Sequence, residues 1–281
     1  MSEKIPDKVT IHTLAEMKSR GEKIACVTAY DYPTAVLADR AGIDVALVGD
    51  TVSMVVAGRP NTLEATIDEM IYHTRAARRG LRRALLVGDM PFGSYHTSET
   101  EAVRNALRLV KEGGAEAVKL EGGRKQAPVV ERIVLAEIPV MGHIGLTPQA
   151  IHMLGGYRVQ GKTQEAGRAL LDDARSLAAA GAFAIVLEGI PRELAARITS
   201  QIPIPTIGIG AGPDCDGQVL VFHDLTGLSL GPTPKFVRQY VDLAAEIDRA
   251  LGGYIADVRS GEFPSDRESY HLPAGAAQLA R

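Results

Sequence analysis

Residues 84–89 read ALLVGD, a short apolar run that ends in a glycine and an aspartate. Seven similar runs occur along the chain, and helical spacing generally follows a run. Such a rhythm is typical of buried parallel strands that alternate with helices. The eight predicted strands are Ile24–Ala29, Val45–Val48, Ala84–Gly88, Ala117–Leu120, Pro139–Gly142, Phe183–Leu187, Pro205–Ile209 and Leu220–Phe222.

The segments between these runs carry signals for helix ends. Thr66 with Glu69, and Ser98 with Glu101, have the spacing of a capping box. No linker rich in Pro, Gly and Ser interrupts the eight repeats, which favours a closed (βα)8 TIM barrel of the α/β class over a doubly wound sheet. A leading helix at Ile11–Ser19 is expected to cap the N-terminal end of the barrel.

The C-terminal part is expected to belong to the same domain, so residues 1–281 are predicted to form a single barrel domain. The last helix is predicted to open at Thr233, with Pro234 in its first turn. A polar tail should follow from about residue 262. The predicted helix carries one apolar stripe, which indicates a homo-oligomer. The stripe consists of Phe236, Tyr240, Ala244, Ile247, Leu251 and Tyr254.

The composition excludes several classes of protein. Hydrophobic residues make up 46% of the 281 residues and Trp is absent, which suits a core of Ala, Val, Ile and Leu. The 31 basic and 34 acidic residues leave a net charge of −3, so neither a nucleic acid nor an anionic membrane is an expected partner. The first ten residues lack an apolar leader, and no apolar run approaches the roughly 20 residues that span a bilayer. A cytoplasmic protein with a small-molecule substrate is expected.

Charged and polar residues stand at or just after the ends of five predicted strands. In a barrel these ends converge on one mouth, where catalytic groups gather. Carboxylates crowded into one cavity repel one another unless a cation compensates, and oxygen ligands favour Mg²⁺ or a similar hard ion. The sequence therefore predicts a metal site at the mouth. The residues concerned are Asp50, Asp89, Lys119, Glu121, His143 and Glu188.

Simpler interpretations of single residues stay open. Any one acidic residue after a strand can serve as a helix N-cap, and His143 can be a packed polar side chain as readily as a substrate contact. Lys119 is more informative, because its neighbours Val118 and Leu120 should face the other side of the strand. The GIGAG segment, Gly208–Gly212, is a tight turn rather than a dinucleotide fingerprint, because proline stands where GxGxxG requires its last glycine.

Longer motifs at the same strand ends resemble the ketopantoate hydroxymethyltransferase family. The match runs in order from about Ile11 to Pro264. The motifs are TAYDYPTA from Thr28, LVGDT ending at Thr51, LLVGDMPFGSY from Leu85, VKLEGG from Val118, GHIGLTPQ from Gly142, GGYRVQGK from Gly155 and IGIGAGPDCDGQVLV from Ile207.

The resemblance implies a Mg²⁺-dependent enzyme of pantothenate biosynthesis. Its reaction would transfer a hydroxymethyl group from 5,10-methylenetetrahydrofolate to 3-methyl-2-oxobutanoate, giving 2-dehydropantoate, and its assembly would be a homodecamer. Glu188 would be the catalytic proton acceptor, and Asp50, Asp89 and Glu121 would hold the metal. The implied substrate-binding residues are Asp50, Thr51, Asp89, Lys119 and His143.

This function has two alternatives. One is a related metal-dependent barrel lyase that acts on another 2-oxo acid without folate. The other is a catalytically silent binding protein. Such a protein should have lost a carboxylate at the mouth, yet all four are present, namely Asp50, Asp89, Glu121 and Glu188. No motif identifies the folate pocket, for which residues 92–95 are candidates only because they follow Asp89.

Overall fold

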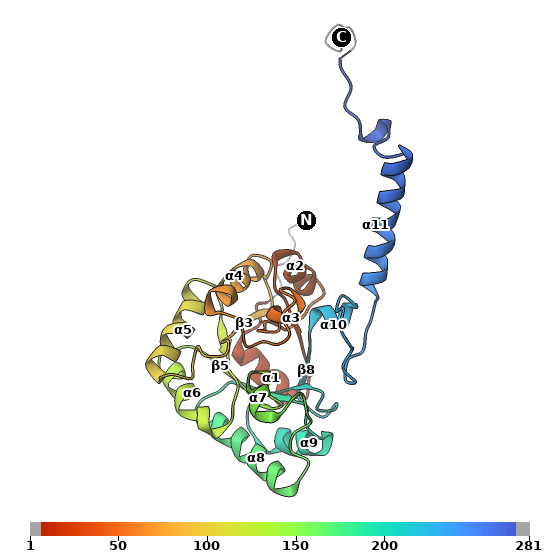
Figure 1. The fold of residues 1–281 in the computed structure, drawn as a ribbon. Helices are drawn as coiled ribbons and strands as arrows, with labels where there is room; N and C mark the ends of the chain where they lie inside the picture. Colours follow the sequence, from red (N-terminus) through yellow and green to blue (C-terminus); the bar gives the residue numbers. More distant parts are fainter. Residues whose placement is uncertain (1–6, 274–281) are drawn as a thin grey trace. The chain divides into compact units, whose positions relative to one another are not determined.

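A computed structural model describes residues 7–273 of the chain, and its central feature is a closed barrel of eight parallel strands (Figure 1). The strands follow one another in sequence order, and the last pairs with the first through Ile24 and Gly217. The predicted (βα)8 TIM barrel is confirmed. The strands are β1 (Ile24–Thr28), β2 (Val45–Val48), β3 (Leu85–Asp89), β4 (Ala117–Lys119), β5 (Val140–Gly145), β6 (Ala184–Glu188), β7 (Thr206–Ile209) and β8 (Gly217–Leu220).

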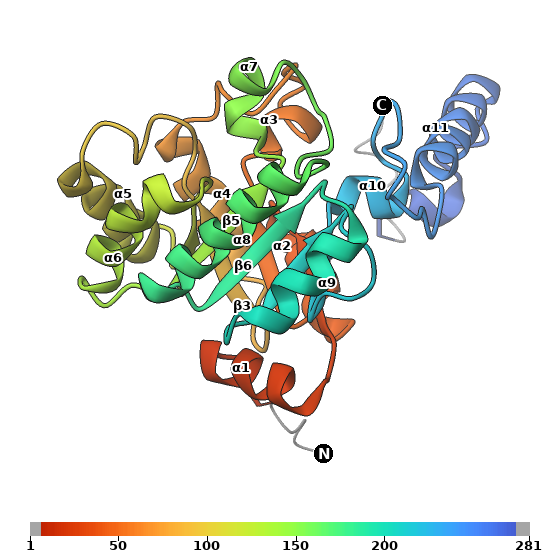
Figure 2. The same cartoon turned by 90° about the horizontal axis from the view of Figure 1, so that it is seen from below.

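Helices separate most neighbouring strands along the chain, although β7 and β8 are joined by residues 210–216 without one. Figure 2 shows α1 at one end of the barrel and the short helices α3 and α7 at the other. The α-helices are α1 (Ile11–Arg20), α2 (Tyr32–Arg40), α3 (Val52–Val55), α4 (Ile67–Arg78), α5 (Glu99–Lys111), α6 (Ala127–Val134), α7 (Ile151–Leu154), α8 (Gln164–Ala179), α9 (Arg192–Gln201), α10 (Phe222–Thr226) and α11 (Leu243–Ser260).

The helix α1 caps the N-terminal end of the barrel, as predicted. Its Leu14 is fully buried and packs in one cluster with interior residues of the strands, among them Ile24 and Leu85. Both predicted capping sites also begin helices. Thr66 forms the complete capping box with Glu69, whereas the Glu101 carboxylate accepts a hydrogen bond from the Thr97 hydroxyl instead.

Alternation along the strands decides which side chains enter the barrel. Leu85 and Val87 belong to the interior cluster and Leu86 to the layer between strands and helices. Asp89 continues the inward series of β3, because every second side chain of a strand points to the same face. In β4, Ala117 is interior and Val118 is not, so Lys119 also points inward as predicted.

The eighth strand begins earlier than predicted. The strand at Leu220–Phe222 was predicted from its apolar residues, but the pairing with β1 starts at Gly217 and ends at Leu220. A β-carbon at position 217 would lie 2.5 Å from the Ile24 carbonyl oxygen, so this close approach needs glycine. Phe222 leaves the sheet, and its backbone N–H donates to the Thr28 hydroxyl at 2.9 Å.

The predicted start of the last helix is wrong. The helix α11 begins at Leu243, where the Asp242 side chain accepts a hydrogen bond from the Ala245 N–H at 3.1 Å. This cap defines the start of the helix. Pro234 begins only an isolated turn, in which the Val237 N–H donates a hydrogen bond to the Pro234 carbonyl oxygen. Phe236 and Tyr240 therefore lie outside the helix, and four of the predicted stripe residues lie on it.

The chain divides into two compact units. Among the described residues, one unit contains 7–222 and 234–237, with the whole barrel, and the other contains 223–233 and 238–273, with α11. The prediction of a single domain over residues 1–281 stays a prediction. Among the described helices, none combines the length and the apolar character needed to cross a membrane.

Candidate active site

One cavity lies where the C-terminal ends of the barrel strands converge, and its empty space, with the open solvent at its mouth included, is about 440 Å³. It brings together all seven residues that the sequence suggested for the site, and their individual roles stay predictions. Apolar residues also line it, and these were not predicted. The seven polar residues are Asp50, Thr51, Asp89, Lys119, Glu121, His143 and Glu188, and the apolar ones include Leu47, Val186, Ile209, Val219 and Val221.

Two buried carboxylates, Asp50 and Asp89, lie side by side at the bottom of this site. Asp89 ends β3 and Asp50 follows β2, and the Asp50 backbone N–H donates to Asp89 Oδ2 at 3.1 Å. Burial, together with the charge of Asp89, raises the pKa of the Asp50 carboxyl well above its usual range. Burial raises the pKa of Asp89 as well. The two negative charges thus lack full compensation within the protein.

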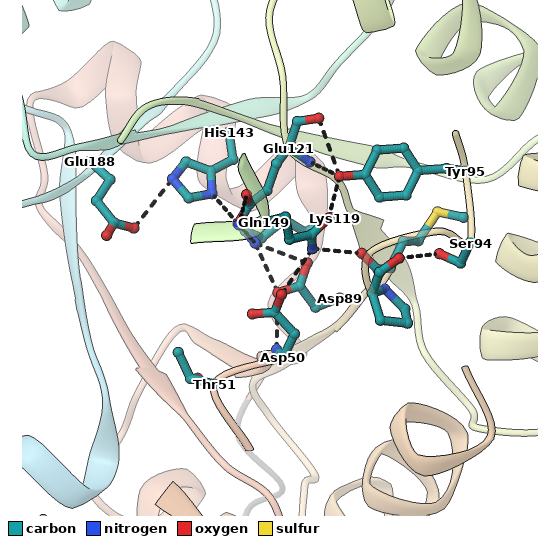
Figure 3. Close-up of polar contacts among 12 residues, drawn as sticks. Asp50, Thr51, Asp89, Ser94, Tyr95, Lys119, Glu121, His143, Gln149 and Glu188 are labelled. Carbon is teal, nitrogen blue, oxygen red and sulfur yellow. Dashed lines mark hydrogen bonds and ion pairs between the residues drawn. The ribbon is translucent and has the colours of Figure 1, made fainter. Parts of the chain in front are cut away.

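Lys119 is the cation that partly balances these charges. Its Nζ atom lies 2.9 and 2.8 Å from the two Asp89 carboxylate oxygens and 3.6 Å from Glu121 Oε1 (Figure 3). Burial opposes the charged form, yet the carboxylates of Asp89 and Glu121 raise the pKa of Lys119 above its ordinary value. Lys119 is therefore an ammonium ion held inside the barrel, available to an anionic ligand.

His143 lies between two carboxylates from neighbouring strands. Its Nδ1 atom is 3.3 Å from Glu121 Oε1, and its Nε2 atom is 3.3 Å from Glu188 Oε2. These are ion-pair distances without the alignment of hydrogen bonds, so both ring nitrogens and Glu121 Oε1 keep hydrogen-bonding capacity. Burial disfavours the imidazolium, but Glu121 and Glu188 raise the pKa of His143 to about 9.

His143 should therefore be charged at neutral pH. Histidine-labelled protein followed by NMR from pH 6 to 10 should show the His143 ring losing its proton near pH 9. Because the folded-state pKa lies above the ordinary value of 6.5, the ion pairs contribute full stability below pH 6.5 and lose it as the pH rises through 9. The stability difference between wild type and His143→Gln should shrink over that range. A His143 ring that is neutral at pH 7 would contradict this assignment.

Thr51 places a hydroxyl at the edge of the cavity. It precedes α3, and its Oγ1 atom lies 2.7 Å from the Tyr30 hydroxyl. The backbone is tight here, because a β-carbon on Gly49 would lie 3.0 Å from Thr51 Oγ1. The hydroxyl of Thr51 is thus held next to Asp50, where a substrate oxygen can reach it.

Two residues that organise the site were not assigned to it from the sequence. Both Gln149 and Tyr95 are buried. Gln149 donates a hydrogen bond to Asp50 Oδ2, and the Tyr95 hydroxyl oxygen accepts one from the Glu121 backbone N–H. Their only sequence signals are the motifs GHIGLTPQ and LLVGDMPFGSY. Tyr95 was a candidate for the folate pocket, but its ring is 1% exposed and cannot hold a ligand from solution, whereas Phe92 is 46% exposed.

The donor set suits a hydrated hard cation. In residues 7–273, no group of three or more His, Cys, Asp or Glu side chains is arranged to hold a metal ion. Mg²⁺ usually keeps several waters and takes one or two protein carboxylates. The buried pair of Asp50 and Asp89, with its uncompensated charge, fits that requirement. Glu121 as a further ligand stays a prediction, since its side chain lies beside Lys119 and His143.

Comparison with known proteins identifies the family to which the chain is similar. The family model described as ketopantoate hydroxymethyltransferase matches residues 8–266. A protein of Koribacter versatilis (strain Ellin345), named 3-methyl-2-oxobutanoate hydroxymethyltransferase, is 57% identical over 269 residues, which cover 96% of this chain and 91% of the relative. A protein of the same name from Carboxydothermus hydrogenoformans is 54% identical, and the matched region covers 95% of this chain and 96% of the relative.

Solved structures of similar fold are more distant in sequence. A phosphonopyruvate hydrolase in complex with oxalate and Mg²⁺ has a TM-score of 0.60 at 13% identity, covering 96% of this chain and 93% of its own. A 2,3-dimethylmalate lyase has a TM-score of 0.57 at 15% identity, covering 92% and 91%. At these identities the likeness concerns the fold alone.

Proposed function

The chain belongs to the ketopantoate hydroxymethyltransferase family, and we propose that its barrel mouth transfers a hydroxymethyl group to 3-methyl-2-oxobutanoate, the reaction for which the relatives are named. The observation that supports this assignment is that seven polar side chains, from the ends of five strands, meet in one cavity. The donor would be 5,10-methylenetetrahydrofolate and the product 2-dehydropantoate, a precursor in pantothenate biosynthesis.

The polar and the apolar lining residues of the cavity suit the two halves of this substrate. A 2-oxo acid has a carboxylate and a keto oxygen, for which Lys119 and the hydroxyl of Thr51 are suitable partners. Its branched apolar tail suits the lining residues Leu47, Val186 and Val219. The cavity thereby favours a small 2-oxo acid with an apolar side chain.

Asp50 and Asp89 would hold Mg²⁺ in this site. When bound, the ion withdraws electron density from the keto group of the substrate and so acidifies the hydrogen on C3. Lys119 offsets the negative charge that develops when this proton leaves. Its ammonium group already contacts both oxygens of Asp89, so it is held in place before the substrate arrives.

Glu188 is the proposed proton acceptor. It ends β6, points into the cavity and is partly exposed, so a substrate can reach its carboxylate. The ring of His143, 3.3 Å from Glu188 Oε2, orients that carboxylate. Once the proton has moved to Glu188, C3 can form a bond to the methylene carbon of the folate. Both bonds from that carbon to folate nitrogens break, a water molecule supplies the hydroxyl group, and tetrahydrofolate leaves with the proton from C3 and the other proton of the water.

A direct assay tests the function. Purified enzyme given 3-methyl-2-oxobutanoate, 5,10-methylenetetrahydrofolate and Mg²⁺ should form 2-dehydropantoate, detected by mass spectrometry, and should consume the folate in equal amount. The control is the same mixture without folate. Cleavage of a different 2-oxo acid without folate, and no 2-dehydropantoate, would favour the barrel lyase and defeat the proposal.

Substitution of the two aspartates should weaken metal binding. Asp50→Asn and Asp89→Asn each remove one negative charge from the cation site, so we expect the Mg²⁺ dissociation constant to rise by more than about tenfold. Isothermal calorimetry on the purified proteins measures it without turnover. Asp172→Asn, an exposed site on α8, is the matched control and should bind as the wild type does. Wild-type affinity in both site variants would refute the ligand assignment.

The remaining expectations concern assembly and location. We propose a homo-oligomer, and from the family resemblance a decamer, in the cytoplasm. Support comes from α11, along which the exposed side chains of Ile247, Leu251 and Tyr254 recur at intervals of four and three residues. A monomer mass from light scattering would contradict the oligomer.

A further inference from the structure

Gln149 is a buried amide that contacts two of the site's carboxylates without lining the cavity itself. It lies in the 3₁₀ turn Pro148–Ala150, directly after β5, and is 4% exposed. Its Nε2 atom is 2.9 Å from Asp50 Oδ2, and its backbone N–H donates to Glu121 Oε2 at 3.0 Å. One residue thus holds an oxygen of each carboxylate.

The orientation of the Gln149 amide follows from its other partners. Its Nε2 atom is also 3.0 Å from the Met90 carbonyl oxygen, which can only accept a hydrogen bond, so this end must be the NH₂ group. The Oε1 atom then faces the Tyr95 hydroxyl at 2.6 Å and accepts from it. Every donor and acceptor of the side-chain amide has a partner.

Tyr95 extends this chain of hydrogen bonds to the main chain of Glu121. Because its hydroxyl proton goes to Gln149, its oxygen can accept from the Glu121 backbone N–H, 3.1 Å away. The Tyr95 ring is fully buried and fixed by packing. In Figure 3 the Tyr95 hydroxyl points toward Glu121 and Gln149, which lie above Asp50 and Asp89 in this view.

We propose that Gln149 and Tyr95 form a clamp that positions the carboxylates of Asp50 and Glu121 for the metal and the 2-oxo acid. Both are positioning residues, because neither lines the cavity and each acts through a residue that does. The inference rests on the proposed function and adds the origin of the site's geometry. With one oxygen of Asp50 held by the amide, the other is left for a ligand.

The chemistry of the clamp requires glutamine. Glutamate would place an acceptor against the Asp50 carboxylate and the Met90 carbonyl, where a donor is needed. Methionine has nearly the same length and volume, but it offers neither the NH₂ donor nor the carbonyl acceptor. Gln149→Met therefore removes the clamp with little change in packing, and Tyr95→Phe removes only the hydroxyl that orients the amide.

The two variants and their double mutant test the proposal. We expect the Mg²⁺ dissociation constant of Gln149→Met, measured by calorimetry without substrate, to rise by about 10- to 100-fold, as for other groups that orient ligands. The kcat should fall by a similar factor. Tyr95→Phe should show a smaller effect in the same direction. The effect of the double variant should be smaller than the two single effects combined, because Tyr95 acts in part through Gln149.

The control is Thr74→Val, which removes another buried hydrogen bond, from the Thr74 hydroxyl to the Met70 carbonyl oxygen inside α4. It should keep wild-type metal affinity and kcat. Crystal structures of the variants supply a readout that needs neither metal nor turnover, namely the position of the Asp50 carboxylate. If that carboxylate and the Mg²⁺ affinity are unchanged in Gln149→Met and Tyr95→Phe, the clamp is refuted. Failure of the proposed function is distinct, because it shows as absence of product with the wild-type enzyme.

Discussion

Replacing Glu188 with Gln is expected to lower kcat by on the order of 10²- to 10⁴-fold, the usual contribution of a general base. Glutamine keeps the size and polarity of the side chain at the end of β6 but cannot accept a proton. The binding of 3-methyl-2-oxobutanoate should change little, because the proposed contacts to its oxygens come from Lys119, Thr51 and the metal. KM should therefore stay within a few fold of the wild-type value.

The decisive measurement separates proton removal from the later steps. In D₂O without folate, the wild-type enzyme with Mg²⁺ should exchange the C3 hydrogen of 3-methyl-2-oxobutanoate for deuterium, and Glu188→Gln should lose this exchange in proportion to kcat. Glu193→Gln, at an exposed position in the first turn of α9, is the control. Exchange at the wild-type rate in Glu188→Gln would assign the proton to another group.

The inward direction of the catalytic side chains was accessible from the sequence because strand geometry is strict. In β3 and β4, alternation with Leu85, Val87 and Ala117 places Asp89 and Lys119 inside the barrel. A closed parallel barrel then brings the ends of all eight strands to one mouth, however far apart they lie in the sequence. These two regularities were enough to predict that six of the seven residues would meet, whereas Thr51 was expected only from the family resemblance.

The contacts among these residues could not be predicted in the same way. The hydrogen bond between Gln149 and Asp50 joins residues 99 positions apart. It also depends on the shape of a 3₁₀ turn that has no periodic pattern. The sequence left the role of His143 open for the same reason, since its distances to Glu121 and Glu188 follow from the register of three neighbouring strands.

The errors at the C-terminal side have a common cause. Apolar residues near Val221 suggested a strand, and apolar residues near Phe236 suggested a helix. The observed boundaries of β8 and α11 depend instead on hydrogen-bonding partners. Gly217 pairs with β1 although it has no side chain, and Asp242 caps α11 nine residues after the predicted start at Thr233. Hydrophobic patterns detect burial, whereas the ends of elements depend on backbone partners.

Lys119→Met is expected to destabilise the protein by about 3–5 kcal/mol at neutral pH, the usual cost of removing one partner of a buried ion pair. Methionine fills a similar volume, so the loss should come from charge rather than from a cavity. Without the ammonium group, the buried carboxylates of Asp50, Asp89 and Glu121 lose their nearest lysine. Urea unfolding followed by circular dichroism, with EDTA present to remove metal, measures the difference.

The loss should also depend on pH in a defined direction. The carboxyl pKa of Asp50 is already raised in the folded state by burial and by Asp89, and removal of Lys119 should raise it further. An acid with a raised folded-state pKa destabilises the fold when it is ionised, so stability returns as the pH falls through that pKa toward 3.8. The destabilisation of Lys119→Met should therefore be smaller at pH 5.5 than at pH 8.

A partly exposed ion pair offers the matched control. Lys8 Nζ lies 2.7 Å from Glu116 Oε2, and both side chains are about one third exposed. Because water screens such a pair, Lys8→Met should cost less than about 1 kcal/mol. If Lys119→Met cost no more than this control, or if its cost did not change with pH, the ammonium group would not be balancing the carboxylates. The acidic site would then need another source of positive charge even before metal or substrate binds.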